Sequence, residues 1–170
     1  MEPISKIFAI CLTILAIFIT PVLICAQSHD NTLQSMVYSM TDDFVEQARE
    51  QGKITQDMYL DFVRNLDATN VLYDIEITHS HSNVVPVFDD TGDTVGTDTT
   101  DNITYTDDIL KSVYETDGVY LMSKGDMLSV KVTNREPTLG QRLRQIVFFL
   151  SDSSPAINVM DGGIIRDENY

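Results

Sequence analysis

Apolar side chains fill the start of the chain, in one run from residue 7 to residue 25. The run holds no charge, and its only polar side chains are Thr13 and Thr20. As a helix at about 1.5 Å per residue, a run of this length extends roughly 28 Å, close to the hydrocarbon thickness of a bilayer. The pattern predicts a transmembrane anchor over residues 1–26.

A cleaved secretory signal is the alternative interpretation of the same residues. Such a signal has a basic start, an apolar core of about 7–15 residues and small residues before the cut. Here Lys6 is the only basic residue before the run, the run is longer, and Ile24 would stand third before a cut after Ala26. These features favour a retained helix, and cleavage stays open.

The charges on either side of the run predict the orientation of the chain. Lys6 precedes the run, whereas Asp30, Asp42 and Asp43 follow it before the next basic residue, Arg49. Positive charge tends to stay on the cytoplasmic side of a membrane. We therefore expect a single-pass protein of the cell membrane whose C-terminal domain is extracytoplasmic. A cleaved signal would leave that domain on the same side.

Helical periodicity continues beyond the apolar run. Apolar residues recur every three or four positions, neither Gly nor Pro occurs between Val22 and Gln51, and Gly52 then suits a helix C-cap. We expect one helix from the membrane to residue 51, with an amphipathic stalk over residues 27–52. Its candidate assembly residues are Pro21, near the membrane exit, and Leu33, Met36, Val37, Met40 and Phe44 on the apolar stripe.

Residues 53–170 mix helical and strand patterns, which predicts an extracytoplasmic α+β head. Apolar and polar residues alternate cleanly over residues 71–79, the clearest strand. We expect a small antiparallel sheet with the long helix and shorter helices packed against one face. The other expected elements are helices over residues 56–66 and 139–150, a short helix from residue 106, a sheet continuation over 84–88, a hairpin of strands 119–123 and 127–133, and a final hairpin turning at residues 161–163.

Residues 89–108 combine seven aspartates, seven threonines and two glycines with almost nothing apolar. This composition is typical of an exposed, solvated loop. A calcium site is the functional alternative, because the carboxylates of Asp89, Asp90 and Asp93 are hard oxygen ligands. Their spacing does not match the twelve-residue calcium loop, and no Glu closes it. The plain acidic loop is the favoured interpretation.

Charge and cysteine content narrow the function classes. The chain carries a formal net charge of −15. Such an acidic surface repels nucleic acid and anionic lipid headgroups, and it suits a solvated envelope protein or one that meets cationic partners or divalent ions. The anchor makes the membrane a partner, and we expect no nucleic acid. The two cysteines, Cys11 and Cys25, both lie in the anchor, so the head has no disulfide and must be held by packing alone.

Few residues suggest catalytic chemistry. His79 and His81 stand two apart on the predicted strand, where both imidazoles would point to one face and could hold zinc or copper. The sequence places no third ligand beside them, and surface polar residues are the simpler interpretation. The chain lacks a Gly-x-Ser-x-Gly nucleophile motif and a glycine-rich phosphate loop. We therefore expect neither an enzyme nor a cofactor.

The stalk and first strand also carry a resemblance. The motif Phe44-Val-Glu-x-Ala-Arg-Glu-Gln-Gly-Lys-Ile-Thr-x-x-Met-Tyr-x-x-Phe-x-x-x-Leu, followed by Leu72-Tyr-Asp-Ile-Glu-Ile-Thr-His, resembles Tad/Flp-type pilus-associated (TadE-like, pseudopilin-like) membrane-anchored envelope proteins of Gram-positive anaerobes. The resemblance implies a structural subunit of a pilus-like or type IV pilus-related secretion complex. The chain departs from typical prepilins because no Gly precedes the apolar run. The rival interpretation is a secreted or anchored extracellular binding module whose acidic loop, residues 89–108, holds calcium or a cationic ligand.

Overall fold

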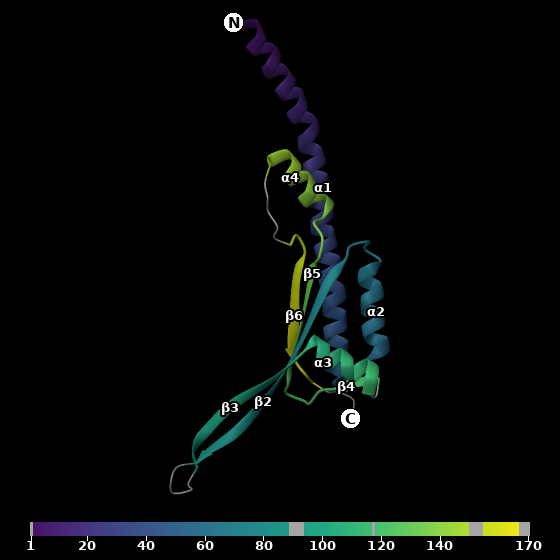
Figure 1. Cartoon of the computed structure of the whole chain (residues 1–170), viewed down its shortest axis with the longest axis vertical. Helices are drawn as coiled ribbons and strands as arrows, with labels where there is room; N and C mark the ends of the chain where they lie inside the picture. The colour runs from purple at the N-terminus through teal and green to yellow at the C-terminus, as the bar shows by residue number, and fades with distance from the viewer. Residues whose placement is uncertain (1, 89–93, 117, 150–154, 167–170) are drawn as a thin grey trace.

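The computed structural model describes the backbone of residues 2–88, 94–116, 118–149 and 155–166, and the side chains of 4–82, 102–115, 118–149 and 155–166. The fold is α+β, as the sequence predicts. A long N-terminal helix packs on a small antiparallel sheet, and shorter helices complete the head (Figure 1). The elements are α1 (Glu2–Gln51), β1 (Lys53–Thr55), α2 (Gln56–Asp67), β2 (Tyr73–Phe88), β3 (Thr94–Tyr105), α3 (Thr106–Lys111), the π-helical turn η1 (Ser112–Thr116), β4 (Val119–Leu121), β5 (Met127–Asn134), α4 (Leu139–Phe148) and β6 (Asn158–Ile164).

The main sheet has four strands in the order β3-β2-β5-β6, and every neighbouring pair is antiparallel. β1 and β4 form a separate two-stranded antiparallel sheet. The first half of α1 extends beyond the head, and its second half lies along the sheet (Figure 1). The β2–β3 ribbon projects from the other end of the molecule (Figure 1). The bare part of α1 and the ribbon therefore point in opposite directions.

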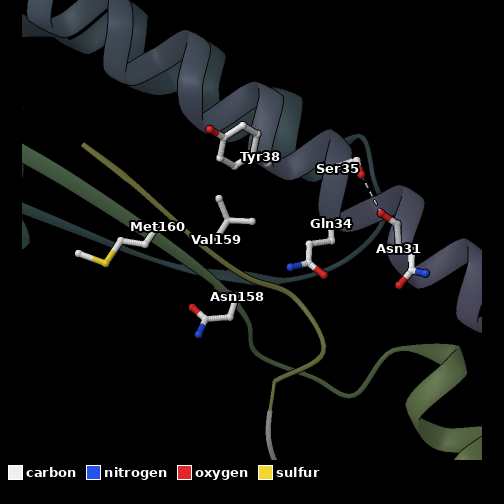
Figure 2. A pocket seen from close by; sticks show the side chains of 7 residues that line it. All are labelled: Asn31, Gln34, Ser35, Tyr38, Asn158, Val159 and Met160. Carbon is white, nitrogen blue, oxygen red and sulfur yellow. Dashed lines mark hydrogen bonds between the residues drawn. The ribbon is translucent and has the colours of Figure 1, made fainter. Parts of the chain in front are cut away.

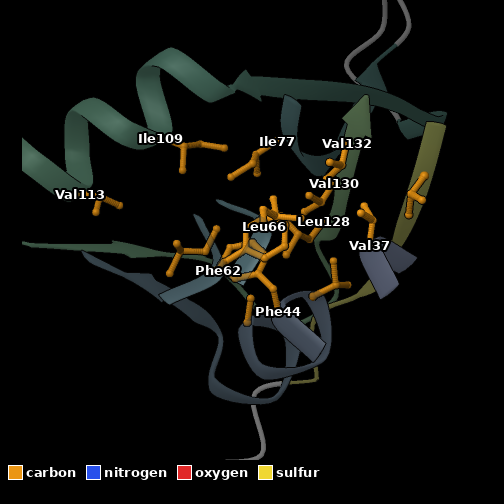
Figure 3. Close-up of a cluster of buried hydrophobic side chains, with 14 of the residues drawn as sticks. Val37, Phe44, Phe62, Leu66, Ile77, Ile109, Val113, Leu128, Val130 and Val132 are labelled. Carbon is orange, nitrogen blue, oxygen red and sulfur yellow. The ribbon is translucent and has the colours of Figure 1, made fainter. Parts of the chain in front are cut away.

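The core lies between the second half of α1 and the main sheet (Figure 3). The amphipathic stripe of α1 supplies side chains that the sheet and α2 bury. Phe44 of α1 stacks on Phe62 of α2 with ring centroids 4.5 Å apart and planes 11° apart. The other core residues are Leu33, Val37, Val45, Ala48, Ile54, Leu66, Ile77, Ile109, Val113, Met122, Leu128, Val130, Val132, Ile157, Val159 and Ile165. The stalk helix is thus part of the head.

Local signals fix the ends of the helices. Gly52 has a φ of 63°, the left-handed conformation that ends α1. The Thr55 hydroxyl accepts from the Met58 N–H at the start of α2. Thr138 and Gln141 form a capping box at the start of α4, and Thr138 also donates to Asp30 of α1 at 2.8 Å. Each cap satisfies a backbone donor that the first helical turn leaves unpaired.

α4 is fixed to α1 at a point just beyond the apolar run. A Cβ atom on Gly140 would lie 2.2 Å from Asp30 Oδ2 and 3.1 Å from the Ala26 carbonyl oxygen, so only glycine fits there. From this contact α4 runs beside α1, with its C-terminal end toward the N-terminus of α1 (Figure 1). The close approach brings a segment of the head to the level of the predicted membrane exit.

Three sequence-based predictions are wrong. Residues 94–105 of the acidic loop form β3, which pairs with β2 from Thr78↔Tyr105 to Phe88↔Thr94. Threonine favours strands because it is β-branched, and a strand in a two-stranded ribbon needs no apolar face.

The strands 119–123 and 127–133 form no hairpin, because β4 pairs with β1 and β5 with β2 and β6.

The predicted hairpin at residues 161–163 is also absent, because β6 runs through it as one strand paired with β5. A Cβ on Gly162 would lie 2.5 Å from the Leu128 carbonyl oxygen, and one on Gly163 would lie 2.6 Å from the Arg49 guanidinium carbon. These glycines therefore permit close packing between segments and do not turn the chain.

Candidate functional site

The first half of α1 is a continuous apolar surface. Every residue from Ile4 to Phe18 is exposed, and the most apolar window of the helix has a mean hydropathy of 2.8 with none of it buried. By length and composition this helix could cross a membrane. Its place at the N-terminus is also that of a signal sequence. Pro21 lies inside the helix, which continues through it.

The structure separates the candidate assembly residues into two groups. Leu33, Val37 and Phe44 are buried in the head, where the sheet and α2 of the same chain cover them. Met40 packs against this core and is half-buried. Pro21 and Met36 remain exposed. Of the six candidates, therefore, only these two are exposed and available to another molecule.

The two predicted histidines come together on a carboxylate that the sequence did not place. His79 lies in β2, and its Nε2 atom is 2.8 Å from Asp126 Oδ2. The Nδ1 atom of His81 is 2.5 Å from Asp126 Oδ1. Asp126 Oδ2 also accepts from the Ser123 N–H at 2.8 Å. On its other side, His79 Nδ1 lies 2.8 Å from the hydroxyl of Tyr120 in β4.

Burial and hydrogen bonding act on Asp126 in opposite directions. Burial raises the pKa of this carboxyl, but the hydrogen bonds from His81, the Ser123 N–H and His79 lower it by more. The net result is a pKa below the ordinary value of 3.8. Asp126 is thus a buried carboxylate that stays charged because three hydrogen bonds stabilise its charged form.

The hydrogen bonds of this cluster suit a structural role better than a catalytic one. The order phenol, imidazole, carboxylate is that of a general-base relay. However, His79 and Asp126 are buried, and both ring nitrogens of His79 already have partners. A substrate would have to displace Tyr120 to reach that ring. The arrangement therefore joins β2, β4 and the segment before β5 through their side chains.

The sequence suggests two metal sites, one for zinc or copper at the histidines and one for calcium in the acidic loop. His79 and His81 each bond to a different oxygen of the Asp126 carboxylate, so the nitrogen that faces Asp126 is already occupied in both rings. Over the residues that the structure describes, no group of three or more His, Cys, Asp or Glu is arranged to hold a metal ion. Asp89, Asp90 and Asp93, the calcium candidates, lie outside the described residues.

A shallow groove lies between α1 and β6 (Figure 2). Its volume is about 500 Å³. Polar side chains of α1 and the edge strand β6 line it, and the Ser35 hydroxyl donates to the Asn31 carbonyl within it. The lining residues are Asn31, Gln34, Ser35, Tyr38, Asn158, Val159 and Met160. The groove therefore combines polar and apolar side chains along one side of α1.

Sequence reasoning identified the histidines and missed their partners. The predicted hairpin of strands 119–123 and 127–133 places Asp126 in its loop, 47 positions from His79. Tyr120 lies 41 positions from the same ring. A buried carboxylate between two strands carries no local pattern, so only the fold brings these residues together.

No family model, curated protein or solved structure matches this chain. Its function is therefore inferred from the geometry of the anchor and the head.

Proposed function

We propose that this protein is a single-pass membrane protein of the cell envelope, with its N-terminus in the cytoplasm and its α+β head outside. It acts as a structural or assembly subunit of a pilus-like or type IV pilus-related secretion complex. One observation carries the proposal: α1 is a single helix whose first half is bare and apolar and whose second half is part of the head core. A force or contact on the anchor is then transmitted directly to the head.

The energetics of the bare half support a membrane location. Eleven large apolar side chains between Ile4 and Ile24 are exposed. Burying such a side chain is worth about 1.5–3 kcal/mol, so leaving the set in water costs on the order of 20 kcal/mol. Lipid, neighbouring helices or both must cover this surface. The single Lys6 before it and the acidic head after it favour the stated orientation.

Small residues on one side of the bare helix support assembly. Ala9, Thr13, Ala16 and Thr20 follow each other at steps of four, three and four, so they share one face. The Thr13 and Thr20 hydroxyls donate to the Ala9 and Ala16 carbonyls at 2.8 Å, which satisfies them inside the helix. Small residues let membrane helices approach closely. The resemblance of the stalk to TadE-like proteins points to the same role.

Fractionation with intact-mass measurement tests the anchor. The tagged protein is expected in the membrane fraction at full-length mass. A soluble product that begins near Gln27 would contradict a retained anchor and would leave a secreted binding module as the function.

Disulfide cross-linking tests assembly. In a Cys11→Ser, Cys25→Ser background, Ala16→Cys is expected to give covalent dimers when membranes are oxidised, because it lies on the small-residue face. The matched control restores Cys11 alone, which helical spacing places on the opposite side. We expect far fewer dimers from that control. If Ala16→Cys and Ala9→Cys both stay monomeric while the protein is full-length and membrane-bound, the assembly part of the proposal is wrong and the anchor part stands.

A further inference from the structure

A second apolar surface lies at the membrane end of the molecule, at the end of α4. Ile146 is 70% exposed, Phe148 is exposed, and Phe149 is 93% exposed. The sequence continues this run as Ile-Val-Phe-Phe-Leu, from residue 146 to residue 150. In water, the exposed apolar side chains of Ile146, Phe148 and Phe149 cost free energy.

The position of α4 relates this surface to the anchor. Gly140, near the start of α4, packs against Ala26 and Asp30, where the apolar run of α1 gives way to polar residues. α4 is about 15 Å long, and it runs obliquely from this contact, with its C-terminal end toward the N-terminus of α1 (Figure 1). Its apolar C-terminal end therefore lies at the level of the bare helix, on the lipid side of the exit point.

The two ends of α4 differ in polarity, as expected for a helix at the boundary of a lipid bilayer. Its first turns carry the exposed basic residues Arg142 and Arg144, and Arg142 pairs with Glu136 at 3.1 Å, toward the head. Its last turn is apolar. Basic side chains next to an apolar end match lipid headgroups above acyl chains. These arginines are a local exception on a chain with a net charge of −15.

From this placement we propose that α4 is a second membrane contact, whose apolar end inserts into the outer leaflet of the bilayer that α1 crosses. The inference rests on the membrane anchoring in the proposed function and extends it. The occupant of this surface is lipid, because the surface continues the lipid-exposed part of α1 and carries basic residues at headgroup level. With both α1 and α4 in contact with the bilayer, the tilt of the head relative to the membrane is fixed, whereas α1 alone would leave it free to vary.

Depth-dependent fluorescence quenching tests the insertion. The full-length protein, in the Cys11→Ser, Cys25→Ser background, receives one cysteine, Phe149→Cys, labelled with an environment-sensitive fluorophore. It is reconstituted into vesicles of phosphatidylcholine and phosphatidylglycerol that carry a nitroxide either near the headgroup or in the middle of the acyl chain. The substitution leaves the fold intact, since the side chain is 93% exposed. Two matched positions accompany it: Phe18→Cys in the anchor and Lys124→Cys on an exposed turn of the head.

The three positions give distinct outcomes. We expect the shallow nitroxide to quench most of the fluorescence of the label at residue 149, and the deep nitroxide to quench less of it. The deep nitroxide should strongly quench the label at residue 18. Neither nitroxide should affect the label at residue 124. Quenching at 18 without quenching at 149 would overturn this inference and leave the anchor in place. A blue-shifted but unquenched label at 149 would also overturn it, because protein and not lipid would then cover the end of α4. No quenching at residue 18 would refute the anchor itself.

Discussion

Replacing Asp126 by alanine removes the acceptor on which two histidines and one backbone amide depend. The Ser123 N–H and His79 Nε2 both lie 2.8 Å from Asp126 Oδ2, and His79 is buried. A buried donor left without a partner costs about 1–3 kcal/mol. The third partner, His81, has a side chain that is 42% exposed, so water can replace its lost bond. We expect Asp126→Ala to lower the free energy of unfolding by about 1–3 kcal/mol, the cost of the buried His79 donor that it leaves without a partner.

Urea denaturation of the full-length protein in detergent, followed by the near-ultraviolet circular dichroism of its tyrosines, measures this loss. The matched control is Asp61→Ala, which removes an exposed ion pair with Arg64 and should cost less than about 1 kcal/mol. If Asp126→Ala and the control have the same free energy of unfolding, the buried network contributes nothing and the reasoning is refuted.

The pH dependence gives the same network a second test. The pKa of Asp126 is lowered on folding from its ordinary value of 3.8, so its charged form stabilises the folded state above that pH. That contribution is lost as the pH falls through the lower folded-state pKa. Asp126→Asn has no such carboxyl, so the stability difference between wild type and this variant should shrink below about pH 4. A difference that stays constant in acid would contradict the lowered pKa.

Three further predictions test other contacts. Gly140→Ala sets a methyl group against the Asp30 carboxylate and should destabilise the α1–α4 contact by about 1–3 kcal/mol, seen as faster tryptic cleavage within α4; an unchanged cleavage rate would contradict the close approach. Phe44→Ala should cost about 3–5 kcal/mol in urea denaturation, whereas Met36→Ala, on the exposed side of the same helix, should cost less than about 1 kcal/mol; equal losses would contradict their different burial. Tyr120→Phe removes one hydrogen bond to the buried imidazole and should cost about 1 kcal/mol in the same assay; a stability equal to wild type would show that this bond contributes nothing.

The long helix and its packing could be predicted because their signals are local. Leu33, Val37 and Phe44 recur with helical periodicity, and the structure buries all three. Thr55 and Thr138 stand where a helix N-cap is expected, and both hydroxyls accept from the first turn. Such patterns depend on residues a few positions apart, which the sequence displays directly.

The pairing of the strands could not be predicted from the same signals. β3 lacks apolar alternation because it pairs in a projecting ribbon, and its acidic composition is typical of loops. Gly162 and Gly163 suggest a turn, yet they leave room for Leu128 and Arg49, which come from distant parts of the chain. The Asp126 cluster was missed for the same reason, since its contacts span more than forty positions.

The contact between α1 and β6 has a consequence for biosynthesis. Arg49 Nε donates to the Ile164 carbonyl 115 positions later, and the Arg166 N–H donates back to the Arg49 carbonyl. α1 is made first, but β6, the edge strand beside its second half, is made after every other helix and strand that the structure describes. Contacts between such distant residues form slowly, and the apolar stripe of α1 stays uncovered in the meantime. In the proposed topology, the exporting cell must therefore protect the stalk until β6 arrives, and a chain that stops short of β6 would reach the outer surface as a target for proteolysis.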